Sequence, residues 1–216
     1  GIDHEETLSA EFALAAMDRL TGDMESSLAQ FSALLPRHID SLGDKHRLTM
    51  SVRNSMGTIL GDLGELDRAA QLLERVESYQ ARALGPDHPT LLGTRNNLAG
   101  VLRRQGRYDE AIAILESVVE TKRRVLGAAH PSTIVSLNNV GSMYETVGRL
   151  DDAHSVLSAA RLASIQEFGP SDRRTLILSS NLAKNQLLRA NNTRALALAD
   201  DALERSVELF GETHAL

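Results

Sequence analysis

Apolar residues recur with helical spacing between residues 84 and 125, in two successive stretches. The first stretch predicts a helix over residues 90–105, because three leucines fall on one face of it: Leu91, Leu98 and Leu102. The second predicts a helix that begins near Tyr108 and whose inner face carries Ala111, Leu115 and Val118. Gly106 lies between them, and a glycine just past the last periodic residue is typical of a helix end. The segment therefore predicts two helices joined by a tight turn.

The same pattern returns every 42 residues along the whole chain. Its most regular marks are glycines at Gly1, Gly43, Gly85, Gly127, Gly169 and Gly211. Three residues after each glycine stands a histidine, at His4, His46, His88, His130 and His214, with Asp172 as the exception. A period without drift predicts a solenoid of stacked copies. We expect one repeat domain over residues 1–216, with units at 1–41, 42–83, 84–125, 126–167 and 168–209 and the start of a further unit at 210–216.

The first and last copies depart from the pattern. Pro36 falls inside the expected second helix of the first copy, where it should kink or end that helix. In the last copy, Asn191, Asn192 and Thr193 stand where a glycine and an apolar residue are expected, so a looser turn is expected there. Neither end resembles a dedicated cap, and we expect the chain to be part of a longer protein, since three apolar residues would otherwise face water: Leu196, Leu203 and Val207.

Composition narrows the class of protein. Hydrophobic residues make up 42% of the chain but aromatic residues only 3%, so aliphatic side chains must form the core. The absence of cysteine excludes disulfides, thiolate metal sites and a cysteine nucleophile. A net charge of -6 argues against general nucleic-acid binding, and no apolar run is long enough to span a membrane. The default expectation is a cytoplasmic protein, and the preference for arginine over lysine suggests a bacterial source.

Three sequence motifs point to a known repeat. They are Asn-Asn-Leu-Ala at 96–99, Gly-Arg-Tyr-Asp-Glu-Ala at 106–111 and Leu-Gly-Pro-Asp-His-Pro at 84–89, with partial copies in the other units. The pattern resembles the tetratricopeptide repeat (TPR), in the 42-residue form of kinesin light chains and of many bacterial multidomain signalling proteins. The resemblance implies an all-α fold, a right-handed superhelix of antiparallel helix pairs in which the first helix of each pair lines a concave groove. It also implies a non-catalytic scaffold that binds a protein or peptide.

Asparagines occupy two neighbouring phases of the first helices. One phase holds Asn54, Asn96 and Asn138, and the next holds Asn97, Asn139 and Asn181. Asparagine is a poor residue for a helix interior, so some other interaction must compensate for it. The resemblance implies that these amides bond to the backbone or terminal carboxylate of an extended peptide in the groove. The alternative is that they bond to neighbouring helices and hold the superhelix together.

Basic residues lie near these asparagines and predict an acidic segment as the bound partner. The candidates are Arg53, Arg95, Arg103, Arg104 and Lys184. Arginine can grip a carboxylate through two parallel hydrogen bonds. Asp62 and Glu145 fall in the same expected lining, so the charge is mixed. Ordinary ion pairs within the scaffold are the alternative.

Metal binding and catalysis are not indicated. Residues in the same phase of stacked helix pairs lie about 10 Å apart, whereas the ligands of one zinc ion lie about 2 Å from it. The histidines are therefore expected to bond to the loop backbone and to order the start of the next helix. Adjacent carboxylates such as Asp151 and Asp152 diverge on a helix and do not form an acid and base pair. We expect no catalytic residue, no metal and no cofactor.

Two other functions remain open beside the peptide-binding scaffold. The repeats could form a regulatory or sensor array that contacts an effector domain of the same larger signalling protein. They could also assemble with copies of themselves through uncapped ends. An RNA-binding repeat fits less well, because such arrays have a different period and a basic surface.

Overall fold

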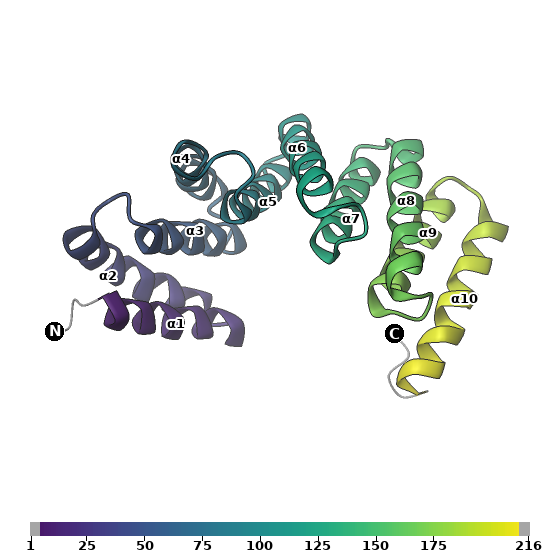
Figure 1. Cartoon of the computed structure of the whole chain (residues 1–216), viewed down its shortest axis with the longest axis horizontal. Coiled ribbons are helices and arrows are strands. Elements are labelled where there is room, and N and C mark those ends of the chain that lie inside the picture. The colour runs from purple at the N-terminus through teal and green to yellow at the C-terminus, as the bar shows by residue number, and fades with distance from the viewer. Residues whose placement is uncertain (1–4, 212–216) are drawn as a thin grey trace. The chain divides into compact units, whose positions relative to one another are not determined.

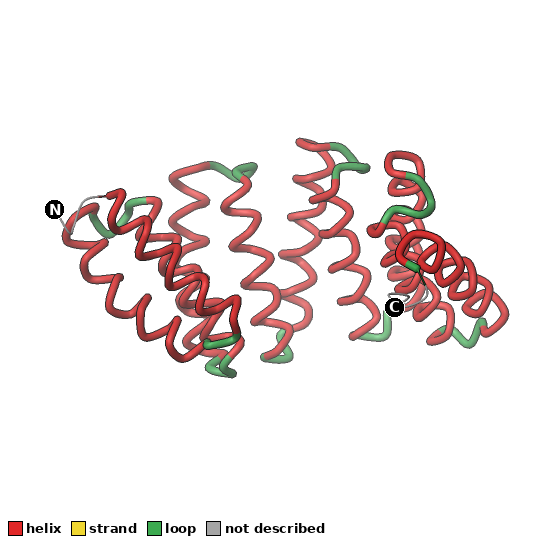
Figure 2. The backbone as a smooth tube through the Cα atoms, turned by 90° about the horizontal axis from the view of Figure 1, so that it is seen from below, coloured by secondary structure: helices red, strands yellow, loops and turns green. Residues whose placement is uncertain are grey.

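The computed structural model describes residues 5–211, and in that range every regular element is an α-helix (Figures 1 and 2). The helices are α1 (Glu5–Thr21), α2 (Met24–Leu42), α3 (Arg47–Asp62), α4 (Leu66–Leu84), α5 (Pro89–Arg104), α6 (Tyr108–Leu126), α7 (Pro131–Thr146), α8 (Leu150–Phe168), α9 (Arg173–Leu188) and α10 (Asn192–Phe210). The predicted all-α class of consecutive helix pairs is confirmed.

The helix lengths follow the 42-residue period. The first helices of the last four pairs, α3, α5, α7 and α9, have 16 residues each, and the second helices have 19 in all five pairs. The turn inside a pair is tight: Gly64 has a φ of 87° and its N–H donates to the Gly61 carbonyl at 3.0 Å. Gly106 repeats this conformation and bonds to the Arg103 carbonyl at 3.1 Å. A left-handed residue that closes a helix in this way satisfies carbonyls that would otherwise lack a partner.

Histidines begin the first helices by capping their N-termini. The Nδ1 atom of His88 accepts a hydrogen bond from the Thr90 N–H at 3.2 Å, and His46 and His130 cap α3 and α7 in the same way. Asp172, the exception in the ladder, caps α9 through its carboxylate at 2.9 Å from the Arg174 nitrogen. The expected structural role is thus confirmed for the described histidines of the ladder, whereas His4 and His214 lie outside the described residues.

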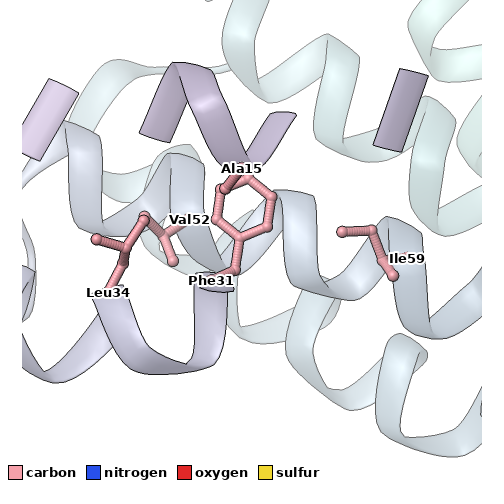
Figure 3. Close-up of a cluster of buried hydrophobic side chains, with 5 residues drawn as sticks. All are labelled: Ala15, Phe31, Leu34, Val52 and Ile59. Atoms are coloured by element: carbon pink, nitrogen blue, oxygen red, sulfur yellow. The ribbon is translucent and has the colours of Figure 1, made fainter. Parts of the chain in front are cut away.

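The chain divides into two compact units, Gly1–Ile114 and Leu115–Leu216, with the division inside α6. In unit 1, α1 packs on α2, α2 on α3, α3 on α4 and α4 on α5, and α1 and α5 also contact α3. Its N-terminal core is built around Phe31 and Leu34 of α2, which lie with Ala15, Val52 and Ile59 (Figure 3). The Phe31 ring is 5.3 Å from that of Phe12 between ring centroids.

Unit 2 repeats the arrangement with α7 packed on α8, α8 on α9 and α9 on α10. Its core is aliphatic, as the composition requires: Leu137, Leu157 and Leu178 are almost completely buried. Within the α7–α8 pair the Leu157 side chain of α8 packs directly on Gly141 of α7, where an added Cβ would lie 2.7 Å from the Leu157 Cγ. Gly57 and Leu73 repeat this close approach in the α3–α4 pair.

Pro36 lies inside α2 and does not end it, because the helix continues to Leu42. The expectation that Pro36 ends the helix was wrong. Proline removes one N–H, which would have bonded to the carbonyl of Ser32 four residues earlier. Both residues are exposed, so water can reach that carbonyl and the cost of the lost bond is small.

The last turn is also more regular than expected. Ala190 stands where the other copies have glycine, and it adopts the left-handed conformation with a φ of 60°. Its N–H donates to the Leu187 carbonyl at 3.0 Å and that of Asn191 to the Gln186 carbonyl at 2.9 Å, the same bonds that close the other turns. The cap hydrogen bonds therefore hold alanine in a conformation that it rarely adopts.

Candidate functional site

Asparagines of successive first helices bond to one another inside each unit. In unit 1 the Asn97 amide donates to Asn54 Oδ1 at 3.4 Å, and Thr94 donates to the same oxygen at 3.2 Å. In unit 2 Asn181 donates to Asn138 Oδ1 at 2.6 Å. Such bonds between neighbouring helices are the ones expected if the asparagines hold the superhelix together. They use only part of each amide, which has two N–H groups and two acceptor positions.

Asn96 and Asn139 differ from these pairs. Asn96 bonds back to the Leu92 carbonyl of its own helix at 2.8 Å, while its Oδ1 is buried and has no hydrogen-bond partner among the described residues. Asn139 is exposed. Both residues therefore retain hydrogen-bonding capacity that the fold, as far as it is described, does not use.

Four of the predicted residues line one hollow between α3 and α5 in unit 1, which we call the α3–α5 hollow. Its volume is about 430 Å³, and its lining consists of Thr58, Gly61, Asp62, Asn96, Asn97, Gly100, Val101, Arg103 and Arg104. Gly100 leaves it open, because a Cβ added there would meet nothing within 4 Å. Amides, arginines and one carboxylate thus come together on neighbouring first helices, as the phases of the repeat predicted.

Charge in this hollow is only partly neutralised. Arg104 donates to the Gly61 carbonyl and lies 4.0 Å from the Asp62 carboxylate. Asp62 also lies 3.5 Å from Arg19 of α1. Arg103 is exposed and no carboxylate of the described residues pairs with it. The positive charge of Arg103 is therefore available to a ligand.

The structure does not bring Arg53 and Arg95 to the α3–α5 hollow. Arg53 donates to the main-chain carbonyl of Asp44 at 2.8 Å and to the Asp44 carboxylate, in the loop that precedes α3. Arg95 forms an ion pair with Glu77 of α4 at 2.8 Å. Each stands next to an asparagine in the sequence, but adjacent helical residues point about 100° apart. Arg95 therefore lies against the second helix α4, and Arg53 is held by the loop that precedes α3.

Lys184 lies in unit 2, where it pairs with Glu145 at 2.9 Å. The Glu145 side chain is only 6% exposed, so Lys184 covers a buried carboxylate. Lys184 also borders an apolar hollow of about 490 Å³ lined by Leu187, Leu196 and alanines of α9 and α10. Leu196 and Leu203 are exposed, at 63% and 45%, as expected, whereas Val207 is half-buried.

The described residues contain no group of three His, Asp or Glu side chains that could hold a metal ion. His38 is buried and bonds to the Leu34 carbonyl at 3.0 Å, and His154 bonds to Gln186 at 2.7 Å. The described helices also include none that is long and apolar enough to cross a membrane.

Comparison with known proteins establishes the family. The model of the tetratricopeptide repeat matches residues 5–80 and 90–161. Because the match covers more than half of the chain, the protein belongs to the tetratricopeptide repeat family, a general protein-interaction fold. Comparison with curated proteins found no match.

Solved structures share the arrangement at low sequence identity. A Podosopora anserina protein, described as a kinesin light chain with nearly identical TPR-like repeats, has a TM-score of 0.86 at 20% identity, over 96% of this chain and 98% of that one. BtubC (BKLC) from P. vanneervenii has a TM-score of 0.78 at 20% identity, over 95% and 81%. MamA from Desulfovibrio magneticus RS-1 has a TM-score of 0.65 at 15% identity, over 94% and 97%. Such identities show the shared fold alone.

Proposed function

We propose that the chain is a non-catalytic, cytoplasmic scaffold that binds an extended acidic peptide segment of a protein partner in the α3–α5 hollow. The observation that carries the proposal is that Asn96, Asn97, Arg103 and Arg104 line this one hollow. Side-chain amides can pair with a peptide backbone, which offers alternating donors and acceptors. Arg103 supplies a charge that no described carboxylate neutralises. An acidic side chain of the partner would complete that pairing.

The geometry assigns different parts to the four residues. Arg104 is held against the Gly61 carbonyl, so it shapes the hollow as well as its charge. Asn97 is bonded to Asn54, and its own Oδ1 remains as an acceptor for a peptide N–H. Asn96 Oδ1 has no hydrogen-bond partner among residues 5–211, and it is the second acceptor if a turn of its side chain opens it to the peptide. The negative charge of Asp62 would repel a carboxylate of the bound peptide at the end of the hollow near α1. Acidic residues of the peptide should therefore bind nearer Arg103.

A display library of ten-residue peptides, selected on the intact chain, tests this proposal. We expect the selected peptides to be enriched in Asp and Glu, and we expect Arg103→Glu to weaken their binding at least tenfold, because a charge-assisted hydrogen bond is worth about 1.5–3 kcal/mol. Arg68→Glu is the matched control, since Arg68 is exposed on α4 and does not line the hollow. The proposal fails if both variants lose binding equally, or if the peptides still bind to a chain carrying Asn96→Ala and Asn97→Ala with Arg103→Glu.

A further inference from the structure

A second hollow of unit 1 lies between the start of α3 and the outer face of α4, and we call it the α3–α4 hollow. It has a volume of about 540 Å³ and shares no lining residue with the α3–α5 hollow. Six of its lining residues are charged: Asp44, Lys45, Arg53, Glu74, Arg75 and Arg82. Four cations thus face two carboxylates around one opening.

Both carboxylates are already engaged. Arg53, whose side chain is only 11% exposed, bonds to the Asp44 carboxylate, and this bond holds the pKa of Asp44 below its ordinary value. The charges of Arg53, Arg75 and Lys45 act in the same direction, so Asp44 stays ionised and paired. Glu74 lies 3.6 Å from Arg107, which stands outside the hollow.

The other three cations have no such partner. Lys45, Arg75 and Arg82 are exposed, and no carboxylate of the described residues forms an ion pair with them. Arg82 donates to the Ser78 carbonyl at 3.0 Å and to the Ser78 hydroxyl at 2.9 Å, which turns its guanidinium back along α4. Arg75 lies two helical turns earlier on the same face of α4, and both arginines line the hollow.

Another copy of the repeat shows that the fold does not need these charges. In the α7–α8 pair the six equivalent positions, 84 residues later, carry no charge: Ala128, Ala129, Leu137, Ser158, Ala159 and Gln166. That pair nevertheless has helices of 16 and 19 residues and the same turn. The charges of the α3–α4 hollow are therefore not a requirement of repeat packing.

We propose that the α3–α4 hollow binds a phosphate monoester group. A phosphate monoester carries close to two negative charges at neutral pH and three acceptor oxygens, which matches the two arginines and the lysine that line this hollow without an ion-pair partner among the described residues. A single carboxylate would neutralise only one of the three free cations. The group can belong to a phosphorylated side chain of a protein partner or to a small phosphorylated molecule, and its chemistry at the hollow is the same in both cases.

Isothermal titration calorimetry on the intact chain tests the proposal with three peptides of glycine and serine that differ only at one central residue: phosphoserine, serine or glutamate. We expect saturable binding of the phosphoserine peptide and at least tenfold weaker binding of the other two. A titration with inorganic phosphate distinguishes a phosphorylated protein partner from a small phosphorylated molecule. Much weaker binding of phosphate than of the phosphoserine peptide indicates a protein partner, and equal binding indicates a small molecule.

The decisive variant is Arg75→Ala with Arg82→Gln, because these are the residues that the α7–α8 pair already carries at the equivalent positions. We expect it to raise the dissociation constant at least tenfold, since charge-assisted bonds are lost. Arg68→Ala should change it less than twofold. NMR of the unsubstituted chain gives a second readout that needs no variant, in which the Arg82 Nε–H signal should shift saturably with phosphoserine peptide.

Unchanged affinity in the double variant, equal binding of the glutamate peptide, or an unmoved Arg82 signal would each overturn the proposal. Arg103→Glu should leave phosphoserine binding unaltered, because Arg103 does not line this hollow. Failure of peptide binding in the α3–α5 hollow is therefore distinguishable from failure of phosphate binding in the α3–α4 hollow.

Discussion

One added methyl group at Gly141 should overpack the contact between α7 and α8. A Cβ at this position would lie 2.7 Å from Leu157 Cγ and 2.8 Å from Cδ2, against 3.4 Å or more for ordinary contacts. The Leu157 Cγ is the branch point of the side chain and not its flexible end. Leu157 can therefore make room only if its whole side chain shifts within a packed core. Overpacking of this kind costs about 1–3 kcal/mol. Alanine gains about 1 kcal/mol over glycine in a helix interior, so Gly141→Ala should destabilise the chain by about 0–2 kcal/mol.

Gly93→Ala is the matched control. Gly93 also lies inside a helix, α5, but it is exposed and a Cβ there would meet nothing within 4 Å. It should gain about 0.5–1 kcal/mol from helix propensity alone. The difference between the two variants isolates the overpacking cost, and it should appear as a gap of roughly 2–12 °C between their thermal unfolding midpoints, followed by circular dichroism at ~222 nm.

A double-mutant cycle with Leu157→Ala tests the cause. Removing the leucine side chain leaves a space, so Gly141→Ala should become neutral or stabilising in that background, with a coupling of about 1–3 kcal/mol. If Gly141→Ala stabilises the unsubstituted chain as much as Gly93→Ala does, the two helices do not approach as closely as the structure shows, and the reasoning fails.

Three further predictions concern single residues. His88→Ala should destabilise the chain by about 1 kcal/mol through loss of the α5 cap, whereas His88→Asp should retain most of the stability, as Asp172 does for α9; chemical denaturation of both variants checks this. Ala190→Gly should raise the unfolding midpoint, because it removes the strain of an alanine in the left-handed conformation, which costs about 1 kcal/mol. An equal or lower midpoint would contradict this prediction. Burial, together with the Glu116 hydrogen bond, raises the pKa of Tyr144 to about 12, so its contribution to stability is fully present below about pH 10 and is lost between pH 10 and 12. Tyr144→Phe should remove that part of the pH dependence, measured as the free energy of unfolding across this range.

The repeat architecture could be predicted because its signals are local and recur. A glycine after the last apolar position and a histidine before the next helix need only neighbouring residues to act, so Gly106 and His88 were interpreted correctly. Pro36 and Ala190 could not be judged in this way. Whether a helix survives a proline depends on solvent access to one carbonyl, and whether alanine can replace glycine depends on the strength of the surrounding turn.

The candidate site could be predicted only where helical periodicity determines which residues share a face. Asn96, Asn97, Arg103 and Arg104 come together because they share a face of α5. Arg53 and Arg95 were assigned to the same face from their adjacency to asparagines, but their direction is set by Asp44 and Glu77, which belong to other segments. The α3–α4 hollow was not predicted, since it needs a loop and two helices at once. Comparing equivalent residues between copies could have revealed its charges.

The joint between one helix pair and the next is chemically self-contained. Gly43 closes α2, the His46 N–H donates to the Gly43 carbonyl at 3.2 Å, and the same histidine caps α3. These bonds are made entirely within a few residues of the joint. A gene segment encoding one whole copy could therefore be duplicated or deleted with both new junctions retaining their caps, so such a protein can change length in steps of 42 residues, through recombination alone.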